Sequence, residues 1–458
     1  MEKIRVSNFL TLEDIELEIK PINIIIGEQA QGKSVLAKLV YFFKSFWVYY
    51  RDSILNNQSE DKFKLKICRH FTEIFPKYTW QEEVFVIEYS LKGYNLVLER
   101  QSLSQDDNQI QFSYSEALSH TRQAIQEVLD SDNKKHNNQV TEKIQFTSDN
   151  KFTQNQHYLQ SIADLKNYLF DVSFIDDCIS TLVFESKDIQ EETGSYIPAS
   201  RTFFSSVESN IFSMLSRDLN IDKFIKEFGS LYESFKKKYL QIFVEQNSLE
   251  NEKIRKLTSQ IVGGNYAREN GQDIIEFTHD NKTKKINLVN ASSGQQESLP
   301  ILIILSALSV VEQRFFLVVE EPEAHLFPEA QKDMVALMSL IFNLTKKRNK
   351  LFITTHSPYF LSSFNSHLEA GNVFKAIKNK PSEEVTNFQE RLFEIMPQNR
   401  IIDIEDIGVY SLKNGNLANI IDPETNLIDA DMIDGVSEKI AEEFDELLDL
   451  ESEVCQWH

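Results

Sequence analysis

The sequence predicts an α/β fold in which a mixed or parallel sheet is flanked by helices. Three apolar runs of strand length support this prediction, because each ends in a polar loop that leads into a helical pattern: Ile22–Ile26, Phe315–Val319 and Leu351–Thr355. Strands of a parallel sheet are buried on both faces, so they form continuous apolar runs rather than alternating ones. These runs therefore favour a sheet that is covered by helices.

Four parts follow one another along the chain. Residues 1–50 contain two short strands, the first apolar strand and a helix. Residues 51–190 form an α+β insertion rich in Asn, Gln, Asp and Ser, with a hairpin that turns at Lys92-Gly93 and helical patterns near 117–129 and 159–170. Residues 191–365 contain a helical subdomain and the other two apolar strands.

Residues 366–458 contain C-terminal strands and a final amphipathic helix with an acidic face. Its apolar positions recur at helical spacing: Ile433, Val436, Ile440, Phe444, Leu447 and Leu448. We expect this helix to dock on the domain, and the alternative is that it binds a partner.

The composition describes an acidic protein with an ordinary apolar content. The 458 residues include 48 Lys and Arg against 70 Asp and Glu, a net charge of −22 that opposes attraction to nucleic acid or anionic membrane. DNA or RNA contact would need a local basic patch, and the three candidates are more typical of solvated helix ends or loops: Lys236–Lys238, Lys284-Lys285 and Lys346–Arg348.

Cysteine usage and the lack of long apolar runs indicate a cytoplasmic protein. Cys68, Cys178 and Cys455 form no C-x-x-C pair, so neither a zinc site nor a disulfide framework is expected. The N-terminus lacks a signal sequence, and no apolar run approaches the roughly 18 residues of a membrane span.

The octet Gly27–Ser34 follows the first apolar strand and has the pattern G-x-x-x-x-G-K-S. A loop between a strand and a helix directs backbone N–H groups and the positive helix end at one small volume, which suits a polyphosphate. The pattern predicts ATP phosphate binding by Gly27, Gln31, Gly32, Lys33 and Ser34, with the Ser34 hydroxyl also a ligand of Mg²⁺.

Paired acids follow the second apolar strand, and a histidine follows the third. Two carboxylates at the tip of a buried strand are costly unless positive charge lies nearby, and Mg-ATP would supply it. We expect Glu320 to reach Mg²⁺ and Glu321 to orient and deprotonate the attacking water. His356 is the second expected catalytic residue, because a neutral imidazole could hydrogen-bond the water or the γ-phosphate.

A second loop with a helix after it lies between the phosphate loop and the paired acids. It reads Asn290-Ala291-Ser292-Ser293-Gly294-Gln295-Gln296-Glu297 and precedes the apolar helix that starts near Leu299. A hydroxyl and a glycine at a helix N-terminus form another anion site.

Along the chain the motifs follow in the order phosphate loop, Ser-Ser-Gly-Gln-Gln segment, paired acids and histidine. In that order they resemble the motifs of the ABC-type ATPases, which are P-loop NTPases. The resemblance implies an ABC-type ATPase head in which ATP is sandwiched between two copies of the chain. Ser293, Gly294 and Gln295 would then act in trans. The chain departs from the usual pattern at Glu320, where Asp is common, and it lacks an obvious Q-loop glutamine. Arg201 is the proposed equivalent, and the alternative is an ordinary strand end.

Within that superfamily the chain resembles the overcoming-lysogenization-defect (OLD)-like ATPases of bacterial anti-phage systems, such as PtuA of Septu and AriA of PARIS. Five segments carry the resemblance: Ser195–Arg201, Ala291–Glu297, Glu320–Pro328, Thr354–Pro358 and Leu427–Asp431. It implies a homodimer or higher homo-oligomer that acts with a separate nuclease or effector subunit. Large OLD nucleases carry a Toprim domain after the ATPase, whereas here Asp429-Ala430-Asp431 is more typical of an acidic loop. No intrinsic nuclease is therefore expected.

Three other functions remain open at this point. An SMC-like DNA-repair or recombination ATPase that clamps DNA directly would call for long heptad arms or a basic groove, and the sequence shows neither. A nucleotide sensor that hydrolyses little is disfavoured by Glu321 and His356. A transport ATPase is disfavoured because no membrane segment is predicted.

Overall fold

The computed structural model describes most of the chain as two compact units. The described residues are 2–102, 110–126, 193–201, 222–244, 248–311, 313–378 and 382–429, together with Leu447. One unit comprises residues 1–19 and 38–194, and the other comprises residues 20–37 and 195–458. Apart from Leu447, the helices predicted near 159–170 and 433–448 lie outside the described residues, as do Cys178, Asp431 and Cys455. The four parts expected from the sequence stay predictions.

The first unit contains an antiparallel sheet with the strand order β6-β5-β4-β1-β2. Its strands are β1 (Glu2–Phe9), β2 (Leu12–Glu18), β4 (Phe85–Leu91), β5 (Tyr94–Arg100) and β6 (Gln111–Tyr114). The predicted hairpin is confirmed, and its turn has positive φ at both Lys92 (48°) and Gly93 (89°). Two positive φ values suit a type I′ turn, whose twist matches that of the flanking strands.

Helices α1 (Lys33–Leu55) and α2 (Glu60–Ile74) contribute to the core of the first unit, although α1 begins in the second unit. The helical residues 116–126 also contribute, with Leu118 and Ile125 buried. The core is rich in aromatic rings. Phe9 of β1 lies 5.6 Å from Phe71, 5.1 Å from Phe75 and 4.9 Å from Phe85, measured between ring centroids. The segment after residue 51 thus supplies buried aromatic side chains that pack on the N-terminal strands. These aromatic side chains are not evident from the polar overall composition of the segment.

The second unit contains the predicted helix-flanked, mostly parallel sheet, so the fold class is confirmed. The strand order is β14-β13-β3-β12-β11-β7. The strands are β14 (Asn416–Asn419), β13 (Ile407–Lys413), β3 (Ile22–Ile26), β12 (Lys350–Thr355), β11 (Phe315–Glu320) and β7 (Thr193–Ile197). β13, β3, β12 and β11 run parallel, with Ile24 of β3 opposite Val409 and Ile353. The loops after β3, β11 and β12 therefore begin at the same edge of the sheet.

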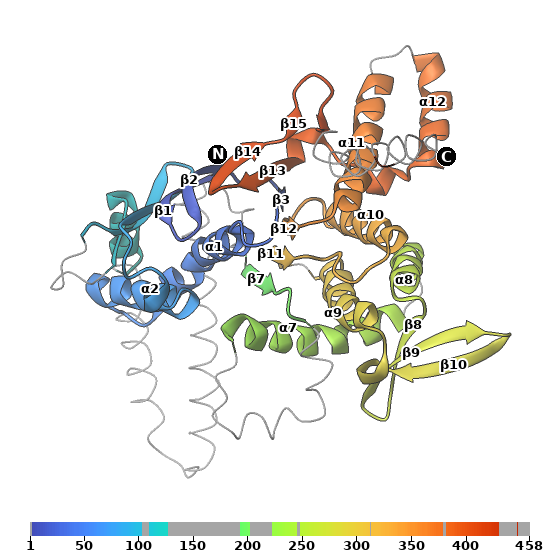
Figure 1. Ribbon diagram of the computed structural model, residues 1–458, viewed down its shortest axis with the longest axis horizontal. Helices are drawn as coiled ribbons and strands as arrows, with labels where there is room; N and C mark the ends of the chain where they lie inside the picture. The colour runs from blue at the N-terminus through green and yellow to red at the C-terminus, as the bar shows by residue number, and fades with distance from the viewer. Residues whose placement is uncertain are drawn as a thin grey trace, which may run out of the picture. The chain divides into compact units, whose positions relative to one another are not determined.

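Helices flank this sheet, and a small hairpin sheet adjoins them (Figure 1). The helices are α7 (Lys223–Tyr239), α8 (Leu249–Val262), α9 (Ser293–Leu308), α10 (Pro328–Leu344), α11 (Pro358–Lys378) and α12 (Ser382–Ile395). The hairpin sheet consists of β8 (Asn265–Glu269), β9 (Gln272–His279) and β10 (Lys282–Asn287), and a short ribbon of β15 (Ile421–Asp422) and β16 (Leu427–Ile428) follows β14. Every residue of α9 from Glu297 onward is buried, which explains why that helix is apolar all round.

A buried ion pair joins α7 to β9. Lys236 donates to Asp273 at 2.8 Å, and both side chains are fully buried. Asp273 also accepts hydrogen bonds from Tyr266 at 2.7 Å and from Tyr232 at 3.2 Å. The carboxylate is therefore satisfied from three sides, and it is the fully buried counter-ion of Lys236.

We expect Asp273→Ala to destabilise this part of the second unit by about 3–5 kcal/mol, because it leaves a buried ammonium without its buried counter-ion. Hydrogen exchange of the α7 and β9 amides should rise by about two orders of magnitude. The matched control is Glu233→Ala, which removes a half-exposed carboxylate 2.7 Å from the same ammonium. Its effect should stay within about 1 kcal/mol, and equal effects of the two variants would contradict the account.

Candidate nucleotide site

The loop between β3 and α1 holds a compact conformation that two of its glycines permit. A Cβ atom on Gly27 would lie 2.4 Å from the carbonyl oxygen of Leu412 in β13, so any larger residue would displace the loop or the strand. Gly32 has φ 98° and Ala30 has φ 61°. Positive φ at these positions turns the backbone sharply, as expected of a loop that wraps around an anion.

Lys33 is the first residue of α1, and its ammonium lies over the loop that precedes it. It donates hydrogen bonds of 2.7 Å to the carbonyl oxygens of Gly27 and of Glu28. The residue is 6% exposed. Burial lowers the pKa of Lys33, and the charges of three nearby glutamates, Glu321, Glu323 and Glu320, act in the opposite direction. The ammonium is therefore the counter-charge for the acidic end of β11.

Gln31 and Ser34 lie on either side of this lysine in the sequence, in different surroundings. The Gln31 side-chain oxygen accepts a hydrogen bond of 2.7 Å from the backbone N–H of Asn414, at the turn between β13 and β14. Gln31 thus ties the loop to the sheet, and only its amide nitrogen remains available for a phosphate. Ser34 is exposed, so its hydroxyl can reach a ligand.

Glu320 is the last residue of β11 and is 6% exposed. Its Oε2 accepts a hydrogen bond of 3.1 Å from the backbone N–H of Ala199. Its Oε1 is buried and lacks a well-aligned hydrogen bond from the described residues, although the Tyr196 hydroxyl lies close enough to interact with the carboxylate. A buried carboxylate oxygen without a donor is costly unless a cation approaches it, and oxygen ligands suit Mg²⁺. The Glu320 carboxylate and the exposed Ser34 hydroxyl are oxygen groups of the kind that a magnesium ion binds, with phosphates and water as its other ligands.

Glu321 adopts a left-handed backbone conformation, with φ 44°. Its N–H donates to the carbonyl oxygen of Thr354 at 2.9 Å, which fixes the turn after β11 against β12. A residue with a Cβ atom costs about 1 kcal/mol or more in this region. The turn places the half-buried carboxylate 3.1 Å from Nε2 of His356.

His356 connects the acid to the phosphate loop. Its Nδ1 lies 3.4 Å from Nζ of Lys33, and its Nε2 lies 3.1 Å from Glu321. An ammonium can only donate, so Nδ1 must be the accepting nitrogen and Nε2 must carry the proton. The geometry thus assigns the Nε2–H tautomer of a neutral imidazole, which donates to the Glu321 carboxylate. Lys33, His356 and Glu321 form one continuous row.

Glu323 is a further buried acid, for which the motifs predict no role. Its Oε1 accepts hydrogen bonds from the Thr355 hydroxyl at 2.6 Å and from the backbone N–H of His356 at 2.9 Å. Burial raises the pKa of Glu323. Glu323 therefore holds the end of β12 and, with it, the position of the histidine. In the sequence, the one sign of this role is that Glu323 is a third acid, two residues after the pair at the end of β11.

Arg201 supports the same turn from behind. Its fully buried guanidinium donates to the carbonyl oxygens of Pro198 and Glu321, each at 2.8 Å, and also to that of Glu320. Burial lowers the pKa of Arg201, and the nearest acid, Glu297, acts in the opposite direction at 3.8 Å. These contacts are those of a positioning residue that holds the backbone on which both acids stand.

The predicted signature begins α9. Ser292 is the N-cap, and Gln295 completes a capping box with it. The Gln295 amide also donates to the carbonyl oxygen of Val262 at 2.8 Å, so this side chain is engaged within its own chain. Ser293 is exposed at the first turn. A Cβ atom on Gly294 would lie 2.6 Å from the carbonyl oxygen of His325, so the helix packs tightly on the loop after β11.

The structure thus brings together Lys33, Glu320, Glu321 and His356, and it places Arg201 directly behind the two acids. Ser293 makes no hydrogen bond to this group within the described residues.

Among the described residues, no three His, Cys, Asp or Glu side chains converge as a ready-made metal site. None of the described helices has the length and apolarity that crossing a membrane requires.

Comparison with solved structures returns SMC head domains and a recombination mediator protein at low similarity. The Smc head bound to the C-winged helix domain of ScpA has 9% identity and a TM-score of 0.38, covering 91% of this chain and 96% of that chain. The SMC head domain from Thermotoga maritima has 9% identity and a TM-score of 0.34, with coverage of 91% and 97%. The recombination mediator RecF has 11% identity and a TM-score of 0.29, with coverage of 91% and 97%. These values do not assign a function.

Comparison with protein families gives a match over most of the chain. No curated protein sequence matches the chain. A family model described as an AAA ATPase domain matches residues 1–361, which include the phosphate loop, the signature segment, the paired acids and His356. Because the match covers well over half of the chain, the protein belongs to the AAA ATPase domain family.

Proposed function

We propose that the protein is a Mg²⁺-dependent ATPase of the ABC type whose site is completed by a second copy of the chain. The observation that carries this proposal is the row formed by Lys33, His356 and Glu321 beside the buried, partly unsatisfied Glu320. It combines a phosphate-binding cation, a candidate base and a magnesium ligand at one sheet edge. Phosphoryl transfer from ATP needs these three parts, because it is catalysed by positioning the attacking water and by stabilising the charge of the phosphates.

In this proposal the protein's own groups divide the work. Backbone N–H groups of the loop between Gly27 and Gly32, together with Lys33, bind the phosphates. Ser34 and Glu320 would hold Mg²⁺, which offsets the charge of the phosphates when bound. Glu321 accepts a proton from the attacking water. As the water oxygen bonds to the γ-phosphorus, the bond between that phosphorus and the oxygen bridging it to the β-phosphorus breaks. His356 keeps the Glu321 carboxylate in place through its Nε2–H group.

The signature supports completion by a second copy. Ser293 is exposed at the positive end of α9 but makes no hydrogen bond to the phosphate-loop residues of its own chain within the described ranges. A helix N-terminus with an exposed hydroxyl binds anions. We infer that Ser293 and the backbone of Gly294 face the γ-phosphate of the partner's site, whereas the Gln295 side chain stabilises the helix end on which they stand.

At the cellular level, we propose that the protein is the ATPase subunit of an anti-phage complex and controls a separate nuclease or effector subunit. This part rests on the sequence resemblance to OLD-like ATPases. The alternative is an ATPase that clamps DNA directly, as in DNA repair, and the net charge of −22 disfavours it. Titration of the purified protein with duplex DNA at physiological salt distinguishes the two: tight, ATP-dependent binding would favour the alternative.

Ser293→Arg is expected to bind ATP but to lose at least about 100-fold in ATP hydrolysis, because the arginine would block closure on the partner's γ-phosphate. Binding is measured by fluorescence of a labelled ATP analogue and turnover by phosphate release. The matched control is Ser366→Arg, which adds the same charge on α11, away from the site. Normal turnover in Ser293→Arg would contradict the proposed role of the signature.

A further inference from the structure

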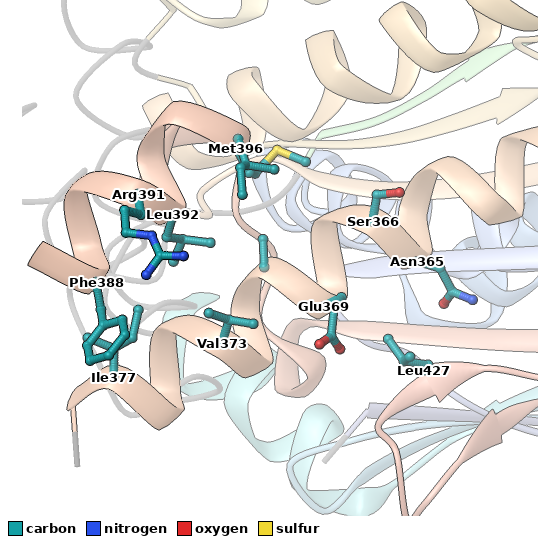
Figure 2. A pocket seen from close by; sticks show the side chains of 12 residues that line it. Asn365, Ser366, Glu369, Val373, Ile377, Phe388, Arg391, Leu392, Met396 and Leu427 are labelled. Atoms are coloured by element: carbon teal, nitrogen blue, oxygen red, sulfur yellow. The ribbon is translucent and has the colours of Figure 1, made fainter. Parts of the chain in front are cut away.

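An apolar groove lies between α11 and α12, lined by residues that take no part in the nucleotide site (Figure 2). Its volume is about 660 Å³. Several large apolar side chains along it are accessible to solvent: Val373 is 37% exposed, Phe388 is 38% exposed and Ile395 is 83% exposed. A contiguous apolar surface of this kind usually marks a site where another segment binds.

The end of the last described strand is fastened at this groove. Asn365 of α11 donates a hydrogen bond of 3.0 Å to the carbonyl oxygen of Ile428 and accepts one of 2.7 Å from its N–H. Leu427 and Asn365 both line the groove. Figure 2 shows Leu427 and Asn365 at one end, with Phe388 and Ile377 at the other. The chain after Asp429 therefore starts from one end of the groove.

The sequence that follows has the pattern of a groove-binding helix. Residues 430–458 follow the last described strand, and they contain ten Asp or Glu and a single Lys. Apolar residues recur at intervals of three or four: Ile433, Val436, Ile440 and Phe444. An amphipathic helix with this spacing lays its apolar side into a groove and leaves its acids in water.

We propose that residues 431–446 of the same chain dock as a helix in the groove between α11 and α12. At 1.5 Å per residue, Ile433 to Phe444 spans about 17 Å, and the groove side of α11 from Asn365 to Ile377 spans about 18 Å. Leu447 is 58% exposed, which agrees with a contact that ends near Phe444.

Charge and connectivity both favour this segment as the occupant. Arg391 lines the groove and is exposed, and it forms no ion pair with any acid of the described residues. An acidic helix would supply its counter-charge. The tether from Leu427 is only a few residues long, and short tethers give effective concentrations on the order of millimolar. The chain's own segment therefore competes well against a separate protein or a second copy.

Hydrogen exchange of the full-length protein tests the proposal. We expect the amides of residues 433–444 to exchange at least roughly tenfold more slowly than in a free peptide of that sequence. Phe388→Glu, which places a charge in the groove, should remove this protection. Asn387→Glu adds the same charge at the neighbouring exposed position, which does not line the groove, and should leave the protection in place.

The reciprocal variant keeps the test decisive if Phe388→Glu disturbs folding. Phe444→Glu should speed the exchange of α11 and α12 amides along the groove, while those of α9 and α10 stay unchanged. Protection of residues 433–444 that disappears on dilution would place the segment in a second copy and overturn the proposal. Unprotected amides in the wild-type protein, or protection that survives both substitutions, would overturn it as well.

Discussion

Lys33→Ala is expected to weaken ATP binding at least about 100-fold, and with it to abolish hydrolysis. The variant removes the ammonium of Lys33, which hydrogen-bonds the Gly27 and Glu28 carbonyl oxygens and offsets the charge of three glutamates. An anionic ligand would then approach Glu320 and Glu321 without compensation, and each lost charge-assisted contact is worth roughly 1.5–3 kcal/mol.

Isothermal titration with a non-hydrolysable ATP analogue measures the effect directly. Lys62→Ala is the matched control, because it removes an equal charge from an exposed position on α2. It should bind within about twofold of the wild-type protein, since exposed charges contribute little to a distant site. An affinity in Lys33→Ala close to that of the wild type would refute the assignment of this loop as the phosphate site.

Glu321→Gln is expected to reduce ATP turnover by a factor of about 10²–10⁴ while ATP binding is retained. The amide oxygen can still accept the hydrogen bond from His356, and the left-handed backbone at φ 44° remains the same. Only the ability to take a proton is lost. The ATP-bound state should therefore accumulate and, in a site completed by two chains, so should the closed dimer or higher assembly.

Phosphate release and mass photometry with and without ATP measure the two effects of this substitution. Glu329→Gln, at an exposed position in the first turn of α10, is the matched control and should behave as the wild type. Wild-type turnover in Glu321→Gln would show that another group serves as the base. Glu323 would then be the next candidate, because it lies beside His356 and burial raises its pKa.

The sheet of the second unit could be predicted because its signals are local. Ile22–Ile26, Phe315–Val319 and Leu351–Thr355 are continuous apolar runs, and each lies in a strand of the parallel sheet. The strand order was not predictable. β3 lies between β12 and β13, which come more than three hundred residues later in the chain, and no local pattern specifies such a pairing.

The motifs named the candidate residues, but the contacts that define their tasks depend on burial and on distant partners. Gln31 bonds to Asn414 and Lys33 to His356, residues that no spacing rule connects. Arg201 was expected as the equivalent of the Q-loop glutamine, and its burial behind the two acids could not be predicted from a short strand end. Glu323 resembles a loop acid in the sequence, and only the fold shows that it holds β12.

The first unit shows a similar limit. The segment after residue 51 is polar on average, yet Phe71, Phe75 and Phe85 pack on Phe9 of β1. A mean composition over many residues hides an alternation that buries one side of each strand and helix. The hairpin at Lys92-Gly93 was visible because its turn has a local signature.

In the proposed ATPase, one chain supplies the phosphate loop of each ATP site and another chain supplies the signature. Mixing Lys33→Ala with Ser293→Arg tests this arrangement most directly, because each variant alone lacks one half of every site. In a mixed dimer, the intact Lys33 of one chain faces the intact Ser293 of the other. The account predicts that hydrolysis reappears in the mixture, at up to about a quarter of the wild-type rate for random pairing of independent sites. A mixture that stays inactive although mixed dimers form would contradict it.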